Sequence, residues 1–165
     1  SIWEGTNYIQ ALDLCARKFT MKKGKVLMTF FGELGKFMAA NKEAADFEEA
    51  MKVFADAFAA YQGILGTFNN YMTSGKIQML GLYATRILHA SAMINCAMLI
   101  LDQAILASKK LAEIGPDHYD ASYYIGKIAS AKFYVMNVLP EIFFIKNVFE
   151  MGDTTAADIP EEALR

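Results

Sequence analysis

The stretch FEEAMKVFADAFAAYQGILGTFNNYM, residues 47–72, carries large apolar side chains at alternating spacings of 4 and 3 residues. This repeat follows the 3.6-residue turn of an α-helix and places the apolar side chains on one face. The stretch therefore predicts a long amphipathic helix that packs against other helices through that face. The seam comprises Phe47, Met51, Phe54, Phe58, Tyr61, Leu65, Phe68 and Met72.

Two further seams with the same spacing lie within residues 77–105 and 121–149, and shorter helices are expected at about 6–22 and 25–40. Short breaks at 73–75 and 113–117 would return the chain antiparallel. Pro140 is expected to kink the last helix, because the apolar pattern continues beyond it. The prediction is an all-α fold: an antiparallel (up-down) four-helix bundle with an additional N-terminal helix.

The helix expected at 76–112 is apolar on a second face as well. A helix that is apolar most of the way round is buried on more than one side. Either an absent domain or a second subunit covers this face, or the helix is central to its own bundle. The second face comprises Met79, Leu82, Met93, Ala97, Ile100, Ala104, Ala107 and Leu111.

Composition limits the partners and the compartment. With 165 residues, 55% hydrophobic content and a net charge of −2, the chain has no cationic excess for binding nucleic acid. The apolar stretch Ile87–Leu101 has 15 residues, too short for a membrane span of ~20 residues. Cys15 and Cys96 lie in apolar helical patterns, which favours buried, reduced thiols in a cytoplasmic protein.

Several kinds of active site lack their residues in this sequence. The two histidines, His89 and His118, are not preceded by Glu at the spacing that di-iron bundles use, and Cys and His are too few for a zinc site. No metal site is therefore expected. His89 is interpreted as a core or interface histidine, and His118 as part of a helix N-terminal turn.

The N-terminal segment Trp3-Glu4-Gly5-Thr6-Asn7-Tyr8 places a carboxylate just ahead of a helix capped by Thr6. The first turn of a helix offers free backbone N–H groups at its positive end, which suits an anion such as a diphosphate. Apolar rings beside Glu4 would desolvate its carboxylate and favour a role as general base. The alternative is a structural one, in which Glu4 is simply an acid near a capped helix.

This segment resembles the Ile-Tyr-Glu-Gly-Thr-Asn-x-Ile-Gln stretch of acyl-CoA dehydrogenases, flavoenzymes that form an α,β double bond in acyl-CoA thioesters. Its continuation resembles the branch with an extended C-terminal helical region, which includes long-chain and methylthiopropionyl-CoA types. Residues 131–140, AKFYVMNVLP, are similar to a stretch near the C-terminus of that branch. Trp3 replaces the usual Tyr or Phe, and Tyr8 stands where the branch often has Gly.

The resemblance implies that Glu4 removes the α-proton, that Gly5 and Trp3 contact the substrate, and that FAD is the cofactor. It places Thr6, Asn7 and Tyr8 near the FAD diphosphate. The expected partners are an acyl-CoA substrate, a flavin-based electron acceptor, the rest of the same polypeptide and a second subunit in a homo-oligomer.

The resemblance also implies a division of the chain. Residues 1–43 would end the catalytic helical domain and carry the base, residues 44–150 would form a C-terminal helical bundle, and residues 151–165 would be a surface tail. Most of the FAD site would lie in absent domains, so the chain should be inactive alone. The alternative is a non-catalytic bundle for dimerisation or for packing against a partner or domain.

Overall fold

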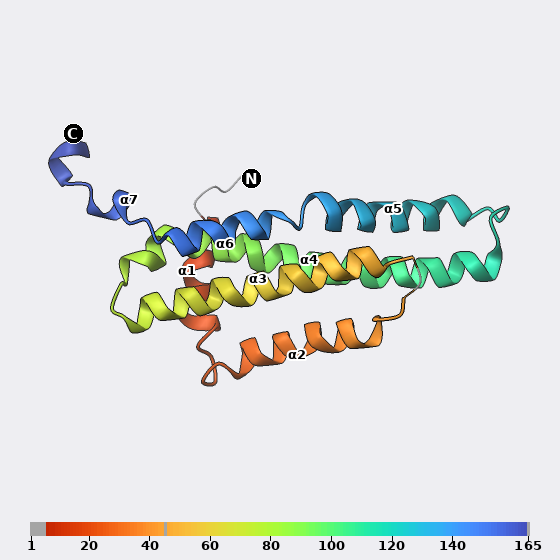
Figure 1. Cartoon of the computed structure of the whole chain (residues 1–165), viewed down its shortest axis with the longest axis horizontal. Helices are drawn as coiled ribbons and strands as arrows, with labels where there is room; N and C mark the ends of the chain where they lie inside the picture. The colour runs from red at the N-terminus through yellow and green to blue at the C-terminus, as the bar shows by residue number, and fades with distance from the viewer. Residues whose placement is uncertain (1–5, 45, 165) are drawn as a thin grey trace.

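The computed structural model describes residues 6–44 and 46–164, and Figure 1 shows a long, narrow molecule built from helices. Within the described residues every regular element is helical, which confirms the all-α fold class. The elements are α1 (Thr6–Asp13), the π-helix η1 (Leu14–Lys18), α2 (Lys25–Ala40), α3 (Glu48–Thr73), α4 (Gln78–Ile114), α5 (Ala121–Asn137), α6 (Glu141–Met151), α7 (Thr155–Asp158) and the 3-10 helix η2 (Glu161–Leu164).

The seam that opened the sequence analysis forms the buried face of α3. Phe47 and the α3 members from Met51 to Phe68 are all buried, and Met72 is half-buried at the helix end. The face packs on α4, α5 and α6. Figure 1 shows α3 and α4 side by side, joined by a tight connection. That connection contains Gly75, whose φ of 77° a side chain would strain.

Helix α4 is the centre of the molecule. It contacts α1, η1, α3, α5, α6 and α7. Both of its apolar faces are used: Ile87 and Ile94 on one and Met79, Ala97 and Ala104 on the other are buried. The chain's own helices therefore cover most of the second apolar face, as the central-helix alternative predicted. Two large hydrophobic side chains of α4 remain exposed, Leu99 and Leu106.

The chain is interrupted at Pro140 more sharply than the sequence analysis expected. Helix α5 ends at Asn137 and α6 begins at Glu141, although the two continue in the same direction (Figure 1). Proline has no N–H to donate to the preceding turn. The turn tightens after it: the N–H groups of Ile142 and Phe143 donate to the carbonyls of Leu139 and Pro140, three residues back. The expected kink is thus a three-residue break.

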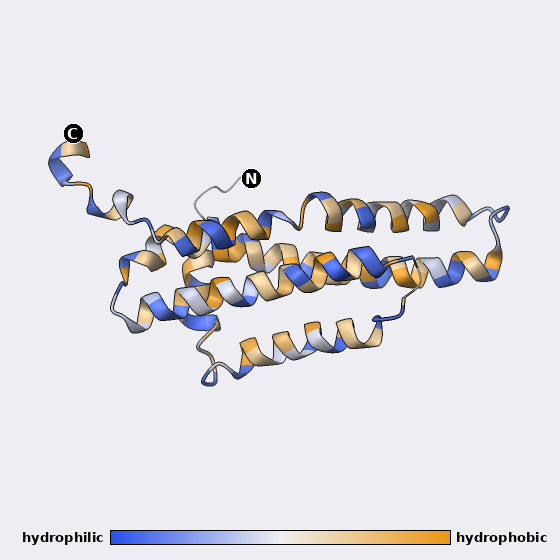
Figure 2. Ribbon diagram, viewed as in Figure 1, coloured by the Kyte–Doolittle hydropathy of each residue, from blue (hydrophilic) through white to orange (hydrophobic). Residues whose placement is uncertain are grey.

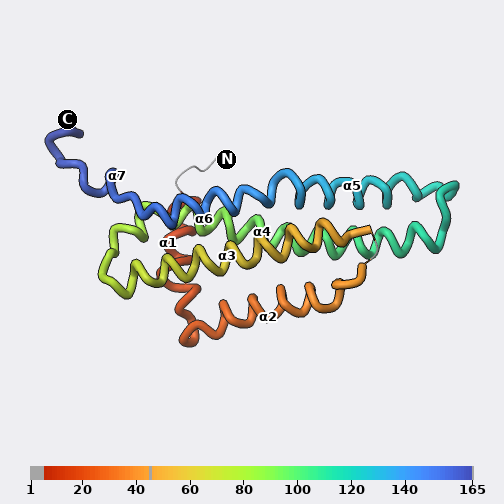
Figure 3. Tube along the Cα trace, in the orientation of Figure 1, coloured from red at the N-terminus to blue at the C-terminus, as the bar shows by residue number. Residues whose placement is uncertain are grey.

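Helix α2 lies along the flank of the bundle, apart from the other long helices, as the tube in Figure 3 shows. It is attached through aromatic side chains. Phe31 packs edge-on against Phe58 with ring centroids 5.5 Å apart, and Phe37 packs edge-on against Phe54 at 5.6 Å. Such pairs contribute about 0.5–1.5 kcal/mol beyond the area they bury. The flank is therefore held by a few large contacts.

Two tyrosines fix the C-terminal end of α6. The Tyr71 hydroxyl donates to the Phe149 carbonyl at 2.5 Å, and the Tyr83 hydroxyl donates to the Asp153 carbonyl at 3.1 Å. The last carbonyls of a helix have no partner within the helix, and the Tyr71 hydroxyl supplies one for α6. The Tyr83 hydroxyl holds the chain just beyond the C-cap Gly152. Beyond Gly152, α7 and η2 are exposed (Figure 1), in the stretch expected as a surface tail.

Two side chains of α4 are more exposed than a place in the core would allow. Cys15 is buried as predicted, but Cys96 and His89 are exposed on α4, so neither is in the core of this chain. His118 lies in the turn before α5, where its Nδ1 accepts from the Asp120 N–H at 3.1 Å, as the helix-start interpretation predicted.

Apolar residues, orange in Figure 2, recur along α4, α5 and α6. By length and composition alone, Gln78–Ile114 and Ala121–Met151 are long and apolar enough to cross a membrane. The first of these is α4, whose apolar side chains pack against the surrounding helices. A core helix of a bundle passes the same test, so this finding is weak evidence for a span.

Candidate functional site

The candidate site begins at the N-terminal turn of α1. Trp3, Glu4 and Gly5 lie outside the described residues. Thr6, Asn7 and Tyr8 form the first residues of α1, all of them exposed, and this turn contains no acidic residue. The three residues predicted to contact a diphosphate are therefore adjacent on an exposed helix start without a repelling carboxylate of their own.

Helix α1 is fixed by packing against α4. Ala11 has no exposed surface and sits in the core with Ala84 and Ala90 of α4. Gly81 permits a close approach, because a Cβ at that position would lie 3.3 Å from the Tyr8 hydroxyl oxygen. The Tyr8 hydroxyl thus lies beside Gly81 of α4, while 43% of Tyr8 stays exposed at the helix start.

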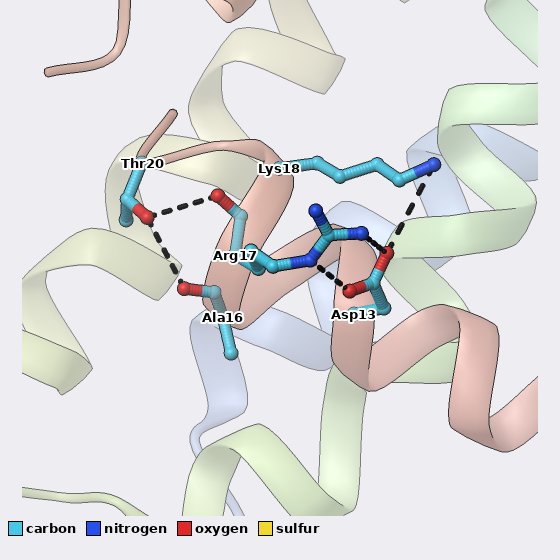
Figure 4. A network of polar contacts seen from close by, with 5 residues as sticks. All are labelled: Asp13, Ala16, Arg17, Lys18 and Thr20. Carbon is cyan, nitrogen blue, oxygen red and sulfur yellow. Dashed lines mark hydrogen bonds and ion pairs between the residues drawn. The ribbon is translucent and has the colours of Figure 1, made fainter. Parts of the chain in front are cut away.

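Below this turn, α1 continues as the π-helix η1. The Phe19 N–H donates to the Leu14 carbonyl at 3.0 Å, five residues back, which widens the turn. The Thr20 hydroxyl then donates to the carbonyls of Ala16 and Arg17 at 3.2 and 3.0 Å and ends the helix (Figure 4). π-Helical turns are rare in proteins, but those that do occur are often found at functional sites.

An exposed ion network lies on η1, drawn in Figure 4. Arg17 donates to both carboxylate oxygens of Asp13, at 2.5 and 2.9 Å, and Lys18 Nζ lies 3.9 Å from the second oxygen. The hydrogen bond from Arg17 holds the pKa of Asp13 below its ordinary value and raises the pKa of Arg17. Asp13 is therefore an ion-pair partner and not a base.

The inner side of η1 meets two hydroxyl groups. Cys15 is buried there, and burial raises the pKa of its thiol to about 12, so it stays protonated and unreactive. The hydroxyls of Tyr61 and Ser91 lie 2.7 Å apart, and Ser91 donates to the Ile87 carbonyl at 2.7 Å. Burial raises the pKa of Tyr61 to about 12. The Cys15 thiol and the Tyr61 phenol therefore both stay protonated near neutral pH.

The sequence analysis missed a cavity of about 360 Å³ beside this pair, walled by η1, α2, α3 and α4. Its signal was the cluster Lys18, Lys22, Lys23 and Lys25, a run of cations flanked by apolar residues. Elsewhere in the described part of the chain, no three His, Cys, Asp or Glu side chains gather closely enough to hold a metal ion.

Comparison with known proteins places the chain in a family. A family described as acetyl-CoA dehydrogenase C-terminal-like matches residues 30–160. Two proteins named butyryl-CoA dehydrogenase from Syntrophomonas wolfei subsp. wolfei are 49% and 48% identical to this chain, over 163 and 164 residues respectively. The broad-specificity linear acyl-CoA dehydrogenase FadE5 of Mycobacterium tuberculosis is 27% identical over 168 residues.

These alignments cover 99% of this chain but only 26% to 27% of each relative. The chain thus spans about a quarter of the length of the curated relatives it matches. The family match covers most of the bundle, and the alignments with the relatives also include the N-terminal segment. The chain therefore belongs to the acyl-CoA dehydrogenase family and corresponds to the C-terminal region of its members.

Proposed function

We propose that this chain is the C-terminal part of an FAD-dependent acyl-CoA dehydrogenase that forms an α,β double bond in an acyl-CoA thioester. Glu4 is the base of this reaction and takes the α-proton. One observation carries the proposal: the Trp-Glu-Gly-Thr-Asn segment leads directly into an exposed helix start in a chain of this family. FAD, when bound, supplies the acceptor for the hydride that leaves the β-carbon.

The chain's own residues have separate roles in this proposal. The backbone N–H of Glu4 donates to the thioester carbonyl, where negative charge develops as the α-proton leaves. Gly5 lets the substrate approach the backbone, and Trp3 shapes the acyl pocket. The exposed first turn of α1 fits a diphosphate because it contains no acidic side chain, so Thr6, Asn7 and Tyr8 would hold that group through their backbone.

The isolated chain should neither retain FAD nor turn over substrate, because the proposed site takes most of its contacts from polypeptide beyond these 165 residues. The partners in this proposal are an acyl-CoA substrate, a flavin-based electron acceptor, the rest of the same polypeptide and a second copy in a homo-oligomer. The division at residues 43 and 150 and a cytoplasmic location stay predictions.

A second candidate function, packing or dimerisation, is supported by the outer face of α5 and α6. Ile125, Phe133 and Phe144 are more than half exposed there, with 51%, 63% and 62% of their surface accessible. This role is compatible with the first and would belong to the bundle. Light scattering of the complete protein with Phe133→Ser and Phe144→Ser tests it: a smaller assembly supports the role, and an unchanged one contradicts it.

The catalytic proposal is tested by α-proton exchange in the complete protein. Glu4→Gln should abolish exchange of the α-proton of a bound acyl-CoA with deuterated solvent, while the visible spectrum shows that FAD is retained. Asp56→Asn, an exposed carboxylate of α3, is the matched control and should exchange normally. Normal exchange in Glu4→Gln would contradict the role of this residue, even if the family assignment stands.

A further inference from the structure

The cavity beside η1 has the lining of a ligand site. Its walls are formed largely by apolar side chains of η1, α2 and α4, and its volume of about 360 Å³ lies within the range of small-molecule pockets, roughly 300–1,000 Å³. The apolar lining comprises Leu14, Phe19, Val26, Leu27, Phe30, Leu88 and Ala92.

The polar groups of the cavity differ in what they offer. Ser91 commits its proton to the Ile87 carbonyl, so the Tyr61 hydroxyl must donate to Ser91. This pair therefore presents only acceptor lone pairs and repels an anion. Lys18 and Asn95, which also line the cavity and are less buried than Tyr61, carry N–H donors. An anionic group thus finds donors at the more exposed residues and none at the buried pair.

One cation, Lys18, lines the cavity, and further cations are close to it in the sequence. Residues 14–32 contain Arg17, Lys18, Lys22, Lys23 and Lys25 and no Asp or Glu, in a chain of net charge −2. Acids border this stretch on both sides and are already paired: Asp13 accepts from Nε and Nη2 of Arg17, with Lys18 Nζ 3.9 Å away, and Glu33 lies 2.8 Å from Lys36 Nζ. Lys22 and Lys23 adopt left-handed φ values of 50° and 59° before Gly24, which turns the chain back beside η1.

From this combination we propose that the cavity binds a single aliphatic chain that carries an anionic head group. The tail lies against the apolar walls, and the head lies at Lys18 among the cations of residues 17–25. Thr6, Asn7 and Tyr8 do not line this cavity, and the proposal does not depend on the chemistry proposed for Glu4. The ligand class follows from an apolar space whose N–H donors, Lys18 and Asn95, are less buried than the Tyr61 hydroxyl and include its one lining cation, Lys18.

Equilibrium dialysis of radiolabelled decanoate with the complete protein tests the site. Ala92 is exposed on α4 and lines the cavity, so Ala92→Trp should fill the space without disturbing the core and weaken binding at this site at least about tenfold. The matched control is Ala59→Trp on the exposed face of α3, which should bind as the parent does. Equal binding in all three proteins would overturn the proposal.

The head group is tested by charge. Lys18→Glu should weaken decanoate binding several-fold, whereas Lys109→Glu, an exposed lysine on α4, should leave it unchanged. Decylammonium should bind more weakly than decanoate to the parent protein. Decylammonium binding as tightly as decanoate, or Lys18→Glu behaving as its control does, would contradict the anionic head.

Two further comparisons separate a pocket from a surface. Octanoate should bind roughly tenfold more weakly than decanoate, because each buried CH₂ contributes about 0.8 kcal/mol. The parent protein should bind free decanoate without membranes. Attachment to phosphatidylglycerol vesicles with no binding of free decanoate would replace the pocket by a membrane-surface site and overturn the proposal.

Discussion

The region before residue 44 and the helices α3–α6 are built differently, although both are helical. Among described residues 6–43, only Ala11, Cys15 and Leu34 are buried, whereas each helix from α3 to α6 contributes several side chains to one continuous core. The helices of the bundle therefore bury most of their apolar faces against one another. The N-terminal region presents an exposed helix start, an ion network and a cavity, which are features for contact with other molecules.

The largest effect is expected when the stability of a bundle variant is compared with that of a variant in the N-terminal region. Ile94 of α4 has no exposed surface, so Ile94→Ala should lower the free energy of unfolding by about 2–5 kcal/mol. Ile9 of α1 is 61% exposed, so Ile9→Ala should change the free energy of unfolding by less than about 0.5 kcal/mol. Urea unfolding of both variants checks the difference. Equal losses would mean that α1 is as much a part of the core as α4.

The next effect concerns the end of the bundle. Gly152 has a φ of 61°, and a Cβ there would lie 2.8 Å from the Tyr71 hydroxyl. Gly152→Ala should lower the free energy of unfolding by about 1–2 kcal/mol, because alanine is strained in the left-handed conformation. The close contact of its Cβ with Tyr71 should lower it further. Gly75→Ala is the control, because its φ is 77° and nothing lies within 4 Å of its added Cβ. Thermal melts should rank Gly152→Ala as the less stable, and the opposite ranking would exclude the contact with Tyr71.

A smaller effect, limited to alkaline pH, tests where the N-terminal region is anchored. Burial raises the pKa of the Cys15 thiol from 9.0 to about 12. As pH rises, the thiol ionises in the unfolded chain before it ionises in the folded one, which favours unfolding. The stability that depends on the protonated thiol is therefore complete below pH 9 and is lost between pH 9 and about 12. Cys15→Ala should make the alkaline decline shallower. The remaining slope is assigned to the tyrosines whose pKa burial also raises: Tyr61, to about 12, and Tyr83 and Tyr134 in the same direction. A slope as steep as the parent's would show that Cys15 is not buried.

The smallest effect is expected on the surface of η1. Arg17 lowers the pKa of Asp13, so their interaction stabilises the fold above the ordinary value of 3.8 and is lost as pH falls below it. Asp13→Asn should therefore be slightly less stable than the parent at pH 7 and equal to it near pH 2. Salt should shrink the difference, because the pair is exposed. A difference that persists at low pH would indicate a structural role for the Asp13 side chain.

The sequence predicted the helical bundle well, because the bundle forms by packing of apolar helix faces and the spacing of apolar residues shows where those faces lie. The α3 seam follows one period, and its members from Phe47 to Phe68 are buried. The exposure of His89 and Cys96 was not predictable, because α4 is apolar nearly all round and only its neighbours decide which positions stay open. Ile77 continues the predicted seam but precedes α4 and is 69% exposed.

The N-terminal region was harder to predict in detail. A helix was expected over residues 6–22, and the structure instead changes from α1 to η1 and then to left-handed residues at Lys22 and Lys23. These changes come from hydrogen bonds five residues apart and from backbone conformations that periodicity does not encode. The cavity follows from them, since Leu14, Lys18 and Phe19 form one of its walls.

The central claim is that the acid ahead of α1 acts on an acyl-CoA thioester. A crystal structure of the complete protein with FAD and an unreactive acyl-CoA analogue tests it most directly. We expect the Glu4 carboxylate within hydrogen-bond reach of the α-position, at about 3 Å, with Thr6–Tyr8 beside the diphosphate. A Glu4 side chain held by a lysine or arginine, away from the ligand, would contradict the claim.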